Sequence, residues 1–215
     1  MSRNARTRRL TPPSATLPPR AQEPAGPPLV SLLAQGARPT DVLPRLHQYA
    51  LQVTGGSCSL LFEHNPRNAV LQATSGYGVD ELRTDPWAPS DAEGALVSET
   101  FIRRAPTFVS DVAQQMPELS ERLKTPAALL VPLVRGADRS GLLVIGFIEV
   151  PDADVVSRGV AEVPDIFLTS LELFRLRQNE ELERELRQLF DDFSAGLSTS
   201  LNIAAGLDGV CSGAN

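Results

Sequence analysis

Two apolar runs near the middle of the chain, residues 127–134 and 142–150, stand on either side of a short polar segment. Each run is far shorter than the roughly 20 apolar residues that a membrane-spanning helix needs. The segment between them, RGADRSG, holds the Gly, Asp and Ser that turns favour. The pattern therefore predicts a β-hairpin of buried strands inside a sheet. Pro132 lacks an N–H group, so we expect it at a bulge or at a position without a ladder hydrogen bond.

The spacing of apolar residues predicts further elements before this hairpin. Val42, Leu46, Tyr49 and Val53 recur every three or four positions, which places them on one face of a helix that starts near residue 40 and ends at Gly55. The following patterns predict strands at 57–64, 69–75 and 107–112, and helices at 91–104 and 116–124. Together with the central hairpin these elements indicate an α+β domain with an antiparallel sheet.

The last third of the chain has the pattern of a long helix. Its apolar or near-apolar positions are spaced by three or four residues, at Phe167, Leu171, Phe174, Gln178, Leu182, Leu186, Leu189 and Phe193. Charged residues fill the other faces, as in a helix that pairs with a second copy. The alternative is one long helix folded against its own domain. We expect the first half to pack in that way and the second half, from Gln178 to Phe193, to form a homodimer, because no other predicted element remains for it to cover.

Residues 200–215 begin a new amphipathic pattern, in which Ile203, Leu207 and Val210 are spaced like the first inward residues of the helix near residue 40. We expect this segment to be the first helix of a second, truncated domain, and the sequence to be the N-terminal part of a longer protein. The predicted organisation is a leader at 1–28, a domain at 29–160, a connecting helix at 161–198 and the truncated helix at 199–215.

Composition narrows the classes of function. The formal net charge of −6 and the sequence pI of about 5.0 argue against general nucleic-acid binding. The only two cysteines, Cys58 and Cys211, cannot build a disulfide scaffold or a cysteine-rich zinc site. We expect a reduced, cytoplasmic location and no membrane span. Residues 1–28 are rich in Pro and Arg and are expected to be disordered, either as an unstructured leader or as a basic arm that touches an acidic partner.

Four segments together resemble a GAF domain over roughly residues 30–151. They are DVLPRLHQYALQVTGG at the first helix, SCSLLFEH at the first strand, ALVSETFIRRAPTFVSDV in the middle and LLVPLVRGADRSGLLVIGFIEV at the hairpin. The resemblance implies a central antiparallel sheet with flanking helices, followed by a long signalling helix. It also implies a sensory role in a bacterial signalling protein, such as a sensor histidine kinase of a two-component system. The chain would then bind a small molecule, or relay a conformational change, to an output domain that lies outside this sequence.

The resemblance does not identify a ligand. The cyclic-nucleotide signature of some GAF domains is missing, as is the helical Cys-His pair of bilin-binding GAF domains, so the cofactor is unknown and no motif implies one. His47 follows inward-facing Leu46 and is expected to point away, and His64 is expected on the surface. A ligand-free GAF scaffold that only holds two chains together is the second hypothesis.

Four residues are candidates for the ligand pocket. Cys58 alternates with inward-facing Leu60 and is expected to be a small buried apolar residue, with a redox or adduct-forming thiol as the alternative. Trp87, Phe101 and Phe108 lie in the section that forms the pocket wall in GAF folds. We expect Phe101 and Phe108 to belong to the core and leave Trp87 open between core and pocket.

Catalysis is not expected in this region. Some GAF-fold proteins reduce free methionine sulfoxide with several cysteines around the pocket. With one cysteine in the predicted domain, the second thiol that this reaction needs is missing. A kinase or another output domain would have to lie elsewhere in the full-length protein.

Overall fold

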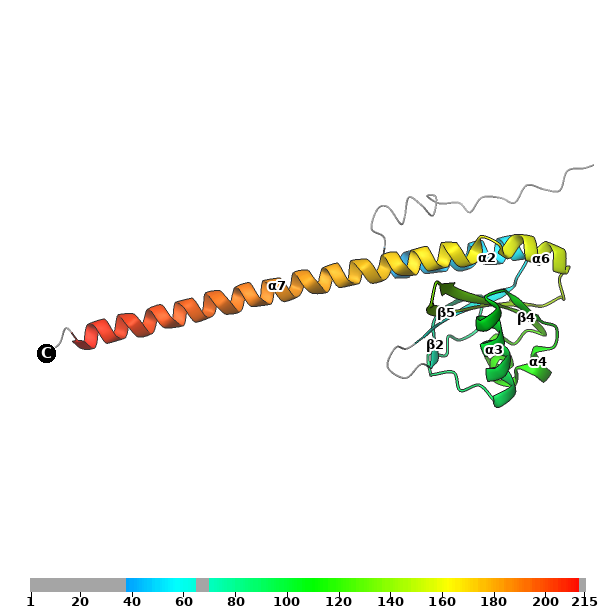
Figure 1. The fold of residues 1–215 in the computed structure, drawn as a ribbon, viewed down its shortest axis with the longest axis horizontal. Coiled ribbons are helices and arrows are strands. Elements are labelled where there is room, and N and C mark those ends of the chain that lie inside the picture. Colours follow the sequence, from blue (N-terminus) through cyan, green and yellow to red (C-terminus); the bar gives the residue numbers. More distant parts are fainter. Residues whose placement is uncertain (1–37, 65–69, 213–215) are drawn as a thin grey trace, which may run out of the picture.

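A five-stranded antiparallel sheet separates two apolar clusters and organises the domain (Figure 1). The computed structural model describes residues 38–64 and 70–212, and the strands lie in the order β2-β1-β5-β4-β3. The predicted leader at 1–28 and the start of the predicted strand at residue 69 fall outside the described residues. The elements are α2 (Pro39–Thr54), β1 (Cys58–His64), β2 (Leu71–Tyr77), α3 (Asp91–Arg103), β3 (Thr107–Val109), α4 (Val112–Gln115), α5 (Pro117–Leu123), β4 (Ala127–Arg135), β5 (Asp138–Phe147), α6 (Ala153–Val160) and α7 (Val163–Ser212).

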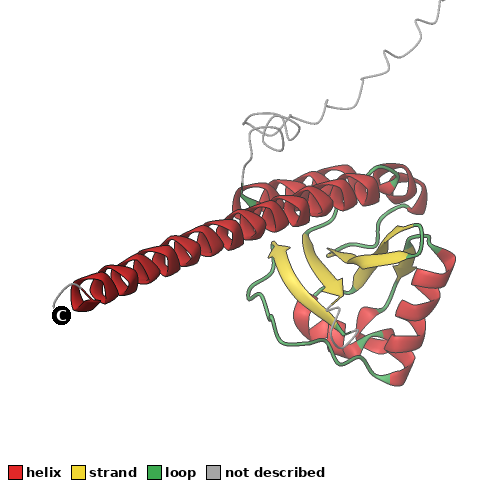
Figure 2. Cartoon of the chain, turned by 60° about the vertical axis from the view of Figure 1, so that its left-hand side comes forward, coloured by secondary structure: helices red, strands yellow, loops and turns green. Residues whose placement is uncertain are grey.

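The two sides of the sheet carry different helices. Along β1, Leu61 belongs to one apolar cluster whereas Leu60 and Phe62 belong to the other, because successive strand residues face opposite sides. Helices α2, α6 and the start of α7 cover the first side, which we call the α7 face (Figure 2). Helices α3, α4 and α5 cover the second side, which we call the α3 face. The predicted α+β class with a long following helix is confirmed.

The predicted central hairpin is confirmed as strands β4 and β5. Pro132 lies opposite Leu142 of β5, beyond the end of β3, which pairs only with residues 128–130 of β4. The ladder is irregular between Leu133 and Val134, directly after this proline. Strand β4 thus carries its proline beside a bulge and past the end of its outer neighbour, as a residue without an N–H group requires.

Helix α6 was not predicted from the sequence. It lies against α2, and Gly159 is its closest point of approach, since a Cβ there would lie 1.9 Å from the carbonyl oxygen of Val53. Only glycine allows the two helices to come this close. Helix α2 ends at Gly55, which has a φ of 74° and donates its N–H to the carbonyl of Leu51.

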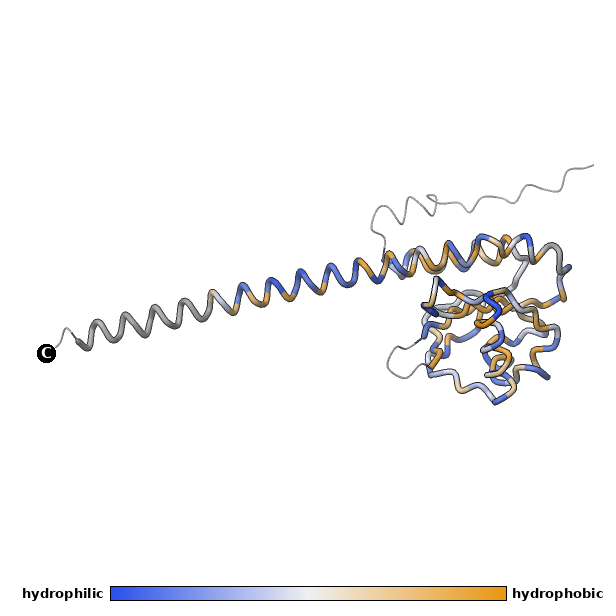
Figure 3. Tube along the Cα trace, viewed as in Figure 1, coloured by the Kyte–Doolittle hydropathy of each residue, from blue (hydrophilic) through white to orange (hydrophobic). Residues whose placement is uncertain are grey.

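Helix α7 is continuous over 50 residues and extends far beyond the domain (Figure 1). Its first turns are buried on the sheet through Val163, Phe167, Leu168 and Leu171, so the expected packing of the first half is confirmed. From residue 178 to residue 195 every side chain is exposed, and polar residues dominate (Figure 3). The backbone passes residue 200 without a break, so the helix expected to begin there continues α7. The side chains of residues 196–212 lie outside the described part, and a second domain stays a prediction.

Candidate functional site

A cavity of about 370 Å³ lies on the α3 face, where helix α3 passes the ends of β1, β2 and β5. This volume is within the range of small-molecule pockets. Its walls are mainly apolar and come from Val70, Leu71, Trp87, Pro89, Val97 and Phe101. Gly94 and Ser98 of α3, His64 of β1 and Arg139 of β5 also line it, and the lining residues that the structure describes include no acidic side chain.

The strand pattern explains why His64 and Arg139 reach this cavity. His64 follows Phe62 at the same alternation along β1, and therefore faces the α3 side of the sheet. On the hairpin, Ser140 is the extra residue of the bulge, because Leu133 pairs with Gly141 and Val134 pairs with Arg139. The bulge shifts the alternation by one residue and turns Arg139 to the α3 face, beside Val134, which packs against the same cluster.

Arg139 is a cation at the edge of an aromatic wall. The carbon of its guanidinium lies 5.6 Å from the centre of the Phe101 ring, and the His64 ring lies 5.7 Å from the same ring. A cation above an aromatic face is attracted by the ring quadrupole. In the part of the chain that the structure describes, Arg139 makes neither a hydrogen bond nor an ion pair with another residue. Its N–H donors are therefore available to a bound group.

Trp87 forms the inner wall of the cavity. Its side chain is 1% exposed, its ring centre lies 5.0 Å from that of Phe62, and its backbone N–H donates to the carbonyl of Leu71. The indole Nε1–H is buried and has no acceptor among the described residues. Buried donors are nearly always paired in folded proteins, and the Nε1–H of Trp87 is an exception among the described residues.

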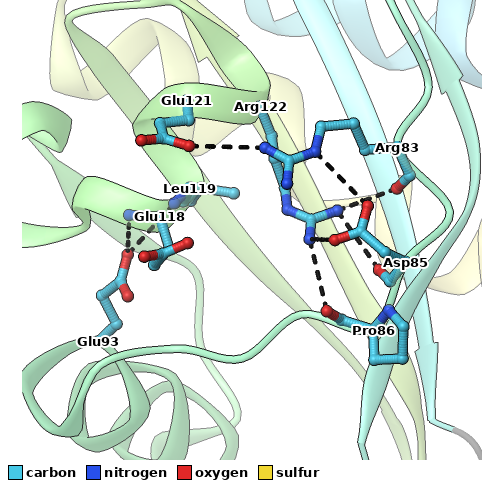
Figure 4. Close-up of polar contacts among 8 residues, drawn as sticks. All are labelled: Arg83, Asp85, Pro86, Glu93, Glu118, Leu119, Glu121 and Arg122. Carbon is cyan, nitrogen blue, oxygen red and sulfur yellow. Dashed lines mark hydrogen bonds and ion pairs between the residues drawn. The ribbon is translucent and has the colours of Figure 1, made fainter.

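Arg122 of α5 fixes the segment that leads into Trp87 (Figure 4). Its side chain is 5% exposed, and it donates to Asp85 Oδ2 at 2.7 Å and to the carbonyl of Arg83 at 2.9 Å. Arg83 in turn lies 3.5 Å from Glu121 of α5. Partial desolvation acts to raise the pKa of Asp85, but the charges of Arg122 and Arg83 prevail and lower it. The segment before Trp87 is thus tied to α5 through side-chain and backbone groups together.

Glu93 fixes the other side of the cavity by capping two helices, and Figure 4 shows its contacts with α5. It is fully buried. One carboxylate oxygen accepts from the backbone N–H of Ser90 at 2.8 Å, which closes a capping box at the start of α3. The other oxygen accepts from the N–H groups of Glu118 and Leu119 in the first turn of α5. A single carboxylate therefore joins α3, which lines the cavity, to α5, which holds the Trp87 segment.

Solved structures of GAF domains share this architecture. The GAF domain from a phosphoenolpyruvate-protein phosphotransferase of Coxiella burnetii has a TM-score of 0.56 at 12% identity, covering 70% of this chain and 92% of that chain. A GAF domain/HD domain protein from Geobacter sulfurreducens gives 0.52 at 15% identity, with 66% and 96% covered. The GAF domain of a two-component sensor histidine kinase from Bacillus halodurans gives 0.50 at 16% identity, with 65% and 97% covered. Comparisons with protein-family models and with curated proteins give no match.

The domain has a GAF-like fold. Within this GAF-like domain, two of the four residues predicted for the pocket line the cavity. Trp87 and Phe101, which is 4% exposed, form its walls. The sequence reasoning missed Arg139, because it treated residues 135–141 as a loop, and missed His64, which it placed on the surface. Strand alternation from Phe62 was the signal that could have found His64.

Cys58 and Phe108 do not line the cavity. Cys58 is 2% exposed, so its expected burial is confirmed, and burial raises the pKa of its thiol. The expectation that Phe108 belongs to the core is wrong: its side chain is 38% exposed. Strand β3 is a short edge strand of the described sheet, so no further strand of that sheet covers Phe108, whose ring lies 5.9 Å from the Phe147 ring.

His47 also differs from the prediction, because it is fully buried on the α7 face. Its Nδ1 lies 2.7 Å from the Ser59 hydroxyl of β1 and its Nε2 lies 2.9 Å from the Ser75 hydroxyl of β2. The ring meets Phe167 of α7 edge to face, with centres 5.5 Å apart. Burial lowers the pKa of His47 to about 4, so the ring is neutral at pH 7. This histidine is a structural contact between α2, the sheet and α7.

Two ion pairs connect α7 to the strand ends next to the cavity. Arg135 at the end of β4 pairs with Glu172, and Glu63 at the end of β1 lies 3.4 Å from Arg175. The end of β1 thus presents His64 to the cavity and Glu63 to α7, and the β4–β5 hairpin presents Arg139 to the cavity and Arg135 to α7. Within the described residues, no group of three or more His, Cys, Asp or Glu side chains is arranged to hold a metal ion. The described helices include none that is both long and apolar enough to span a bilayer.

Proposed function

We propose that this chain is the sensory and dimerising module of a signal-transduction protein. A small molecule binds in the cavity under α3, and α7 carries the resulting change toward an output domain elsewhere in the protein, such as a histidine kinase of a two-component system. The cytoplasmic location expected from the sequence belongs to the same proposal.

The proposal rests on strand ends that contact both the cavity and α7. Arg139 faces the cavity, and Arg135, four residues earlier on the same hairpin, pairs with Glu172 of α7. On β1, His64 faces the cavity and Glu63 contacts Arg175 of α7. A shift of either strand end on binding would alter an ion pair on the opposite side of the sheet. A ligand can shift the equilibrium between two positions of the strand ends only by as much as its affinities for the two positions differ.

The second half of α7 supplies the dimer contact. Its predicted pairing positions Leu182, Leu186, Leu189 and Phe193 are between 50% and 65% exposed, and Gln178 is exposed as well. A row of large apolar side chains at three- and four-residue spacing matches the seam of a coiled coil. Because the domain leaves this seam uncovered, a second copy of α7 is the partner that fits its length and periodicity.

Two observations support a role without catalysis. Cys58 is buried and its thiol pKa is raised by burial, which disfavours the reactive thiolate. His47, the buried histidine, lies within hydrogen-bond distance of two serine hydroxyls on the far side of the sheet from the cavity. Neither residue is placed to act on a molecule in the cavity.

Sedimentation of the full chain tests the dimer. The double variant Leu186→Glu, Leu189→Glu introduces charges into the seam and is expected to convert the dimer to a monomer. The control Arg187→Gln removes only a pair with Glu183 on the exposed face and is expected to leave the dimer intact. A wild-type monomer at tens of micromolar concentration, or a dimer that survives the double variant, would contradict the proposed seam. A dimer whose cavity binds nothing would instead favour the ligand-free scaffold.

A further inference from the structure

We propose that the cavity under α3 recognises a small molecule with an apolar body and a carboxylate group, and that Arg139 binds the carboxylate. This inference rests on the proposed sensory function and defines the chemical class of the ligand.

The walls of the cavity indicate that the body of the ligand is apolar. Leu71, Trp87, Val97 and Phe101 line the cavity with apolar side-chain surface. A molecule that fills the space gains most by burying apolar surface against these walls. Strongly hydrated ligands such as free sugars or inorganic phosphate would lose their hydration without replacement at these walls.

Gly94 leaves one part of the cavity wall without a side chain. It lies in the first half of α3, where glycine lowers helix stability relative to alanine. The fold does not require glycine here, because a Cβ would meet only the Pro89 ring, at an ordinary contact distance of 3.9 Å. A larger side chain at this position would extend along the cavity wall. The missing side chain therefore leaves room for a ligand without serving the fold itself.

Arg139 indicates that the ligand carries a negative charge. Its guanidinium lies at the edge of a cavity whose described lining residues include no acidic side chain, although the chain as a whole carries a net charge of −6. In the described part of the chain no carboxylate pairs with it. A planar guanidinium matches the two oxygens of a carboxylate in a bidentate pair. Arg139 is the one arginine among the described lining residues, and a single guanidinium matches one carboxylate.

Trp87 adds apolar wall and no polar requirement. Its Nε1–H is buried and has no acceptor among the described residues, and because the atom is not accessible from the open cavity a ligand does not reach it without a rearrangement. The preferred ligand is therefore defined by the apolar walls and by a carboxylate for Arg139.

The position of Trp87 makes a direct test possible, because it is the only tryptophan in the chain. Phenylacetate and its neutral analogue phenylacetamide are titrated into the full-length chain while the fluorescence emission of Trp87 is recorded. Phenylacetate is expected to shift the emission and to bind about tenfold or more tightly than the amide, as the exchange of a charge-assisted contact for a neutral one implies. Ligand-detected NMR on the same samples reports binding that leaves the emission unchanged.

Matched variants distinguish the contribution of the Arg139 charge to binding from that of the cavity space. Arg139→Gln is expected to remove the preference for phenylacetate, Arg139→Lys to retain part of it, and the remote control Arg38→Gln to leave it unchanged. Gly94→Leu is expected to block both probes, and the thermal midpoint of each variant shows that it is folded. Equal binding of the two probes, a preference that survives Arg139→Gln, or no binding of phenylacetate by either method would overturn the inference. Sedimentation of the same samples reports the dimer separately, so failure here is distinguishable from failure of the proposed module.

Discussion

Arg139 and Arg135 lie four positions apart on the β4–β5 hairpin, and their side chains lie on opposite faces of the sheet. The guanidinium of Arg139 lies 5.6 Å from the centre of the Phe101 ring, whereas Arg135 pairs with Glu172 of α7. The bulge opposite Leu133 and Val134 places the two arginines on different faces. It adds one residue to β5, so the side chain of Arg139 turns to the face opposite that of Arg135. The hairpin therefore joins the candidate ligand cavity to the helix that leaves the domain.

If the hairpin end transmits binding, breaking its ion pairs should uncouple α7 from the cavity. Glu172→Gln and Glu63→Gln each remove one pair and are expected to reduce the change in hydrogen exchange that phenylacetate causes in residues 163–175. The pairs are largely exposed, so each variant should change stability by no more than about 1 kcal/mol. Glu183→Gln, whose partner Arg187 lies on α7 itself, is the control. An undiminished response in both test variants would show that the ion pairs do not transmit binding.

His47 should make the domain sensitive to acid. Its pKa is lowered by burial from 6.5 to about 4, so the unfolded state binds a proton more readily than the folded state. The free energy of unfolding is unaffected above pH 6.5, falls as the pH drops toward 4, and loses roughly 3 kcal/mol in total. Urea denaturation at a series of pH values measures this loss.

Variants of both histidines identify the source of the acid sensitivity. His47→Leu should flatten the loss between pH 6.5 and 4, at a cost in stability at pH 7 because Ser59 and Ser75 lose their partner. His64→Gln, which changes the other histidine of the chain, should keep the loss. A pH profile of His47→Leu that matches the wild type would place the titration elsewhere.

Glu93 should be among the most sensitive polar positions of the domain. Glu93→Ala removes the capping box of α3 and the acceptor for two N–H groups of α5, and is expected to cost about 2 kcal/mol or more. Glu99→Ala is the matched control on the same helix, because Glu99 is exposed and pairs only with Arg103. It should change stability by less than about 1 kcal/mol. Similar losses for both variants in thermal unfolding would mean that the buried caps contribute little.

Arg122 should control the position of Trp87 more than the fold as a whole. Arg122→Leu keeps the apolar stem but leaves the carbonyl of Arg83 and the carboxylate of Asp85 without their donor. The segment before Trp87 is expected to loosen, which should shift the emission of Trp87 to longer wavelength and raise its quenching by iodide. Lys124→Leu removes an exposed pair with Asp80 and should leave the emission unchanged. Unaltered quenching in Arg122→Leu would contradict the role assigned to this arginine.

The sequence was sufficient to predict the elements in which buried residues recur at a regular spacing. The hairpin runs at 127–134 and 142–150 and the spacing of Val42 and Leu46 predicted the sheet and α2, because each reflects one buried face. His47 was misplaced because α2 contacts the sheet on one side and α6 and α7 on the other, which widens its buried arc beyond one stripe. Arg139 was missed because a bulge depends on how two strands pair, and one strand's pattern does not contain that information.

The most direct test of the sensory account is native mass spectrometry of the full chain taken straight from cells. We expect a dimer that carries an extra bound mass, and we expect Gly94→Leu to lose that mass while remaining dimeric. The added mass would begin to identify the ligand. A monomer without any added mass, from cells in which the chain is folded, would contradict both the dimer seam on α7 and the ligand cavity under α3.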